Sequence, residues 1–167
     1  MTDLSLSIRP ELHSDGEAIE RLHERAFGPG RFARTAFRLR EGGSHDFTLS
    51  FTATVGTLLV GSIRLSPIWA GEVRALVLGP LTVEPAFKDR GIGAALMTRS
   101  LEAAREVGHA LVLLVGDEPY YARFGFRPIP PGQLRLPGPV DPGRFLACEL
   151  TEGALAKARG PVTPRRA

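Results

Sequence analysis

A strand, a glycine turn and a long helix that follow one another directly constrain the fold of this chain most. Residues 73–78 are almost uniformly apolar, which is typical of a strand covered on both faces. Gly79 and Pro80 follow, and because proline cannot donate to a neighbouring strand, we expect a bulge there. From the turn at Gly91 onward, apolar residues recur at helical spacing as far as Gly108, a frequent helix stop.

The junction between the turn and the helix predicts an anion site. A helix N-terminus carries unpaired N–H groups and a partial positive charge, and Gly91 and Gly93 let a phosphate come close. The alternative is that both glycines only shape the turn. A P-loop fits badly because no Gly-Lys-Ser/Thr follows the glycines. A dinucleotide-binding fingerprint also fits badly: Leu96 stands where the fingerprint has Gly or Ala, and residues 112–115, where its acidic residue would lie, contain no Asp or Glu.

Two motifs, one at Lys88, Gly91 and Gly93 and one at residues 120–126, resemble motifs of the GNAT superfamily of N-acetyltransferases. In that family, the loop that binds acetyl-coenzyme A has the pattern (Gln/Arg)-x-x-Gly-x-(Gly/Ala). The turn in this chain matches the pattern at Lys88, Gly91 and Gly93. Lys88 departs from the Gln or Arg of the pattern but keeps the positive charge of Arg. Residues 120–126, YYARFGF, resemble the aromatic-Tyr-x-x-(Leu/Phe)-Gly-Phe motif that follows the family's fifth strand. The resemblance covers roughly residues 5 to 150 in order of elements, and it identifies motifs from about 76 to 126.

The resemblance implies acetyl-CoA as cosubstrate and no metal. The bulge would part the central strand from its neighbour, so that pantetheine pairs with backbone near Leu81 and Val83 while the pyrophosphate sits on the N–H groups of residues 90–94. The N–H of Leu81 would polarise the acetyl carbonyl. The predicted cofactor-binding residues are Leu81, Thr82, Val83, Lys88, Asp89, Arg90, Gly91, Ile92, Gly93, Ala94 and Tyr121.

The sequence suggests one general acid and leaves three candidates for the general base. The resemblance makes Tyr121 the candidate proton donor to the departing thiolate, so Tyr121 and Leu81 are the predicted catalytic residues. The alternative is that Tyr121 only packs the short helix against the core. We interpret Tyr120 as a packing residue. Glu72, Glu118 or a water chain could supply the general base.

Other chemistries find no support in the residue pattern. The four histidines lack metal-ligand spacing, and no Gly-x-Ser-x-Gly elbow is present. Cys148 shares a strand face with two leucines, so we interpret it as core filling. As the single cysteine it excludes an internal disulfide and suits a reducing cytoplasm.

The expected architecture is α+β, in three α/β layers. The GNAT fold implies a mixed, mostly antiparallel twisted sheet of about six to seven strands, flanked by helices, with a V-shaped splay between the fourth and fifth strands. Residues 1–158 are expected to form a single N-acetyltransferase domain, with residues 67–71 as a loop before the central strand. Because residues 159–167 are rich in proline and arginine, we expect a flexible tail there.

Charge and composition narrow the partners. No apolar run is long enough for a membrane span, and the N-terminus does not resemble a signal peptide. The net charge of +3 is modest, so it is weak evidence for nucleic acid, which we do not expect as a partner, and it suits an anionic ligand such as coenzyme A. Arg31, Arg34 and Arg38 would share a helix face, either solvated or gripping an acidic acceptor. The acceptor itself stays open between a small-molecule amine and a protein amine, and a homodimer is compatible with the sequence.

These patterns predict an acetyl-CoA-dependent N-acetyltransferase that transfers an acetyl group to a primary amine by direct attack in a ternary complex, in the cytoplasm. The alternative is a non-catalytic acyl-CoA-binding module of the same fold. A generic nucleotide-binding domain is a third hypothesis, which the mismatched phosphate motifs disfavour.

Overall fold

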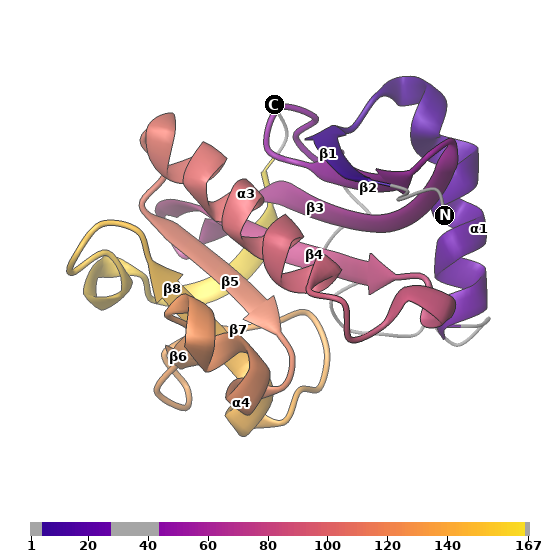
Figure 1. The fold of residues 1–167 in the computed structure, drawn as a ribbon. Coiled ribbons are helices and arrows are strands. Elements are labelled where there is room, and N and C mark those ends of the chain that lie inside the picture. The colour runs from indigo at the N-terminus through magenta and orange to yellow at the C-terminus, as the bar shows by residue number, and fades with distance from the viewer. Residues whose placement is uncertain (1–4, 28–43, 166–167) are drawn as a thin grey trace.

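The computed structural model describes residues 5–27 and 44–165. One sheet forms its centre, with the strand order β1-β2-β3-β4-β5-β8-β6 (Figure 1). The strands are β1 (Leu6–Pro10), β2 (Phe51–Val55), β3 (Leu58–Ala70), β4 (Val73–Val83), β5 (Leu111–Val115), β6 (Arg127–Pro128), β7 (Leu134–Arg135), β8 (Phe145–Glu149) and β9 (Gly160–Pro164). The α-helices are α1 (Gly16–Phe27), α3 (Ile92–Glu106) and α4 (Glu118–Tyr121).

Neighbouring strands along this path are antiparallel, except that β4 and β5 are parallel. The connection between β4 and β5 passes through α3, as a parallel pair requires. The predicted mixed, mostly antiparallel sheet is therefore confirmed, and the seven strands of the main path agree with the six to seven expected.

Helices α3 and α1 cover opposite faces of the sheet. α3 packs so closely on β3 that a Cβ at Gly61 would lie 3.0 Å from side-chain atoms of Ile92 and Leu96. Ile63 shares that face of β3, and it is completely buried. Ser62 points the other way, because side chains alternate along a strand, and it is also completely buried. Since α1 contacts β3 and β4, we place it over this second face.

The central strand carries the predicted bulge. Two residues of β4, Gly79 and Pro80, lie between register pairs that are separated on β3 by Arg64 alone. Two residues of one strand thus oppose one residue of the other, which is the definition of a bulge. The bulge separates the first part of β4, whose apolar side chains are buried on both faces of the sheet, from the segment that continues toward α3.

The C-terminal segment is not the flexible tail that the sequence predicts, at least as far as residue 165. β9 pairs antiparallel with the end of β3 at residues 68–70. Val162 of β9 is buried there, with an exposed fraction of 3%. β3 itself continues through the segment expected to be a loop, and residue 70 pairs with the start of β4. β2 ends before this part of β3, so the edge would otherwise lack a partner, and β9 supplies one.

Candidate active site

The parallel strands β4 and β5 pair over a short distance only. Among the described residues, the register pairs between them are Leu76 with Val112 and Val77 with Leu113. Beyond these, β4 continues beside β3 and β5 continues beside β8 (Figure 1). The facing edges of the two strands therefore separate, which confirms the splay predicted between the fourth and fifth strands.

The edge of β4 that faces the splay carries free backbone groups. The N–H of Glu84 donates to the carbonyl of Val60 at 2.8 Å, toward β3. Because N–H direction alternates along an extended chain, the N–H groups of Leu81 and Val83 point the other way, toward β5. The side chain of Thr82 is 2% exposed and faces away from α3, so it can serve a ligand in the splay only through its backbone.

The N-terminus of α3 follows this edge and is open. Gly91 occupies the N-cap position with φ 78°, in the left-handed region, and no side chain caps it. The first helical hydrogen bond runs from Ala95 N to Gly91 O at 3.0 Å, which leaves the N–H groups of Ile92, Gly93 and Ala94 without an intrahelical acceptor. A Cβ at Gly91 would meet no atom within 4 Å, so the loop is open around the N-cap position.

The three residues before Gly91 are all exposed: Lys88, Asp89 and Arg90. Asp89 has φ 64°, so the loop turns twice through left-handed conformations before the helix begins. The guanidinium of Arg90 lies 5.0 Å from the ring centre of Phe87, where it adds a positive charge beside the open amides. The arrangement can hold an anion by backbone N–H groups and by charge together.

The two tyrosines of the second motif occupy different surroundings. A Cβ at Gly93 would lie 2.9 Å from the hydroxyl oxygen of Tyr120, so that hydroxyl reaches the open helix end. The ring of Tyr121 instead lies against Gly116 and packs edge-on to Phe126, with ring centres 6.0 Å apart. Burial raises the pKa of Tyr121 to about 12, and the neighbouring Tyr120 adds to the rise. Sequence reasoning assigned Tyr120 to packing alone and so missed its approach to the loop.

Of the two carboxylates considered as general base, only one lies at the right end of the sheet. Glu72 lies in the turn between β3 and β4, nine residues before Leu81, which corresponds to about 30 Å along a strand. The hypothesis that Glu72 faces the acceptor is therefore wrong. Glu118 opens α4 directly after β5, and because β4 and β5 are parallel, it lies at the same end of the sheet as the α3 loop.

The remaining expectations concern an arginine-rich face, metal ligands, the cysteine and membrane-spanning helices. Arg31, Arg34 and Arg38 lie outside the described residues. In residues 5–27 and 44–165, no group of three or more His, Cys, Asp or Glu side chains could hold a metal ion. Cys148 is buried against the main core, and burial raises the pKa of its thiol. In the same part of the chain, no helix has the length and apolar character needed to cross a membrane.

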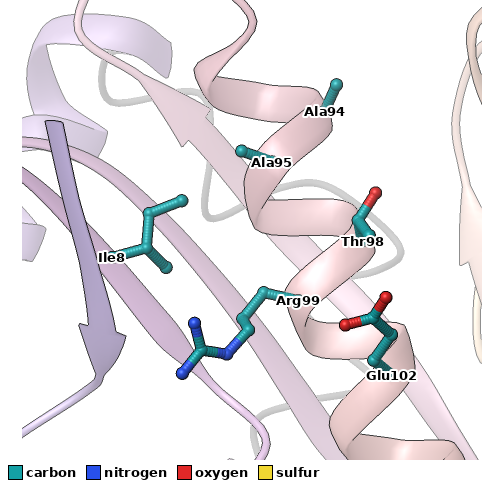
Figure 2. Close-up of a pocket in the computed structure, with 6 residues that line it drawn as sticks. All are labelled: Ile8, Ala94, Ala95, Thr98, Arg99 and Glu102. Atoms are coloured by element: carbon teal, nitrogen blue, oxygen red, sulfur yellow. The ribbon is translucent and has the colours of Figure 1, made fainter.

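A shallow hollow of about 390 Å³ lies beside the candidate site rather than in it. Ile8 of β1 forms one wall and the outer surface of α3 forms the other (Figure 2). Arg99 reaches from α3 toward β1, with its guanidinium 5.2 Å from the ring centre of Phe51. Only Ala94 belongs both to this hollow and to the loop at the helix end, so the hollow does not include the splay.

Comparison with known proteins places this geometry in a family. Residues 16–126 match the model of the acetyltransferase (GNAT) family. The chain belongs to the GNAT family. It is 29% identical over 157 residues to the uncharacterized N-acetyltransferase YhbS of Escherichia coli (strain K12), covering 93% of each chain. It is 30% identical over 149 residues to the uncharacterized N-acetyltransferase YjhQ of the same organism, covering 86% of this chain and 82% of YjhQ.

Solved GNAT structures agree with the fold. The crystal structure of Escherichia coli YhbS in complex with CoA superposes with a TM-score of 0.82 at 28% identity, covering 99% of this chain and 92% of YhbS. A GNAT family acetyltransferase from Brucella melitensis in complex with acetyl-CoA gives a TM-score of 0.62 at 28% identity, covering 91% of this chain and 99% of that chain. The predicted GNAT fold is thereby confirmed, and both crystal structures contain the class of cofactor that the two sequence motifs predict.

Proposed function

We propose that this GNAT protein is an acetyl-CoA-dependent N-acetyltransferase that transfers an acetyl group to a primary amine by direct attack in a ternary complex. One observation carries the proposal: the unpaired edge of β4 after the bulge leads directly to the uncapped, glycine-containing start of α3. An extended acyl chain can pair with the first and an attached diphosphate with the second. The CoA and acetyl-CoA in the two similar crystal structures support the same cosubstrate here.

In this proposal the backbone binds most of the cosubstrate. The N–H groups of Leu81 and Val83 would pair with the pantetheine amides as a neighbouring strand would, and the amides of residues 90–94 would hold the pyrophosphate. Lys88 and Arg90 add positive charge at the loop, while Asp89 contributes its backbone. Glycine at position 93 leaves room for the hydroxyl of Tyr120, which lies 2.9 Å from the position that a Cβ would take.

The chemistry then needs one polarised carbonyl and two proton transfers. The Leu81 N–H donates to the thioester oxygen, where a preorganised donor contributes about 3 kcal/mol to the transition state. The neutral amine attacks the carbonyl carbon, the C–S bond breaks with its electron pair moving to sulfur, and the amine nitrogen loses a proton. We assign the proton delivered to the thiolate to the hydroxyl of Tyr121, which is protonated at neutral pH with or without the rise in its pKa to about 12. Glu118, or water leading to it, is the remaining candidate for the base.

The proposal extends to the acceptor, the assembly and the compartment. A small-molecule amine or a protein amine fits the mechanism equally, and a homodimer is compatible with it. The single cysteine is buried and unpaired, which suits a reducing cytoplasm.

The proposal is tested by two measurements on the full chain. Calorimetric titration with CoA should give saturable binding, and incubation with acetyl-CoA and a panel of amines should release thiol only when an accepted amine is present. Tight CoA binding without release for any small or peptide amine would indicate the non-catalytic module instead. Absence of CoA binding would contradict the proposal altogether.

A further inference from the structure

The hydroxyl of Tyr120 lies at the point where the two halves of the proposed cofactor site meet. The position that a Cβ of Gly93 would take is 2.9 Å from this oxygen, and it is 3.7 Å from a methyl carbon of Val83 and 4.0 Å from one of Leu81. The hydroxyl therefore lies at the first turn of α3, on the side of Gly93 that the side chains of Val83 and Leu81 also approach. A chain that runs from Leu81 to the loop amides must pass it.

The ring of Tyr120 is held in this position from more than one side. The guanidinium of Arg123 lies 4.7 Å from its ring centre. Tyr121 packs edge-on against it at 4.9 Å between ring centres, and Phe124 lies at 5.7 Å. The Arg123 side chain also donates from Nε to the backbone carbonyl of Tyr120 at 3.3 Å, which fixes the residue further. These contacts place the hydroxyl before any ligand arrives, so binding need not order it.

We propose that Tyr120 is a cofactor-positioning residue, whose hydroxyl donates a hydrogen bond to the diphosphate of acetyl-CoA beside Gly93. The inference rests on the proposed function, because it uses the same loop and the same cosubstrate. It goes beyond the motif, in which only Tyr121 is assigned a role. A phosphate oxygen can accept more than one hydrogen bond, so the hydroxyl can donate to an oxygen of the diphosphate in addition to the backbone amides.

The two tyrosines then divide the work. Tyr120 fixes where the cosubstrate lies, and Tyr121, packed against Gly116 and the main core, acts at the sulfur. Removing one hydroxyl at a time separates these roles, because a lost binding contact changes Kd and a lost proton donor changes turnover.

The first test compares Tyr120→Phe with Tyr121→Phe. Tyr120→Phe should raise the Kd for CoA about tenfold, the effect of losing one hydrogen bond to a charged group, and should leave the Kd for pantetheine, which lacks the diphosphate, unchanged. Tyr121→Phe should leave both Kd values near those of the wild type. Equal CoA affinity of Tyr120→Phe and wild type would overturn the proposal. Failure of the wild type to bind CoA would instead refute the proposed function, so the two failures are distinguishable.

A second test examines the contact without any ligand. Gly93→Ala would place a methyl group 2.9 Å from the Tyr120 oxygen, but phenylalanine at position 120 has no atom there. Gly93→Ala should therefore lower the melting temperature more in the wild type than in the Tyr120→Phe background. Equal shifts in the two backgrounds would show that the hydroxyl does not lie at Gly93 and would overturn the inference.

Discussion

Replacing Gly91 by Asp tests the open helix end, and Gly91→Asn is its matched control. Both residues must adopt the left-handed conformation of Gly91, with φ 78°, at a cost of about 1–2 kcal/mol. A Cβ there meets no atom within 4 Å, so neither residue should clash. For a domain of this length, each kcal/mol lowers the melting temperature by about 2–4 °C, so both variants should fold.

The difference between the two variants is one negative charge. At about 5 Å from a phosphate charge, the repulsion is about 0.8 kcal/mol in bulk water and about 3.3 kcal/mol at an effective dielectric constant of 20. Gly91→Asp should therefore bind CoA roughly fourfold to a few hundredfold more weakly than Gly91→Asn. Calorimetry at low and at high salt provides the measurement, and the gap should narrow at high salt because charges are screened. Equal Kd values for the folded Asp and Asn variants at low salt would refute the placement of the diphosphate at this helix end.

Further predictions concern turnover, the core and acid stability. Tyr121→Phe should lower the turnover number about a hundredfold with little change in the Kd for CoA, measured by thiol release and calorimetry; full turnover would make Tyr121 a packing residue. Leu96→Ala removes a completely buried side chain of α3 and should destabilise the fold by about 2–5 kcal/mol in urea unfolding, whereas an effect below 1 kcal/mol would contradict the packing on β3. Burial alone would raise the pKa of Glu11, but hydrogen bonds from His45 and Arg64 outweigh burial and lower the pKa below its usual range. The carboxylate therefore stabilises the fold above the unfolded pKa of about 4.3, and this stabilisation is lost as the pH falls through the lower folded value. Glu11→Gln should be less stable at neutral pH and should show a smaller loss between neutral and acidic pH than the wild type; parallel stability curves would contradict the charged pairing.

Local patterns were sufficient for the centre of the fold. Gly79 and Pro80 predict the bulge because neither residue supports regular pairing, and the glycine turn predicts the start of α3 because glycine allows the positive φ of Gly91. These two features determine where β4 and β5 part, so the position of the backbone that we propose to bind the cofactor also follows from sequence.

Features that depend on distant partners were not predictable in the same way. Pro161 and Pro164 suggest a loose tail, yet β9 forms because the end of β3 lacks another partner on that side. Glu72 directly precedes the central strand in sequence, but the length of β4 carries it far from Leu81. The motif contains adjacent tyrosines, and the packing of Tyr120 against Arg123, Tyr121 and Phe124 places its hydroxyl beside Gly93.

The central claim is that backbone amides at the splay and at the start of α3 bind acetyl-CoA. A titration of isotope-labelled protein with CoA, followed through its backbone amide resonances, tests this claim most directly. The amides of Leu81, Val83 and residues 91–94 should show the largest shifts, and all should saturate with one Kd. Saturable binding that leaves these amides unshifted and moves resonances elsewhere on the sheet would contradict the account.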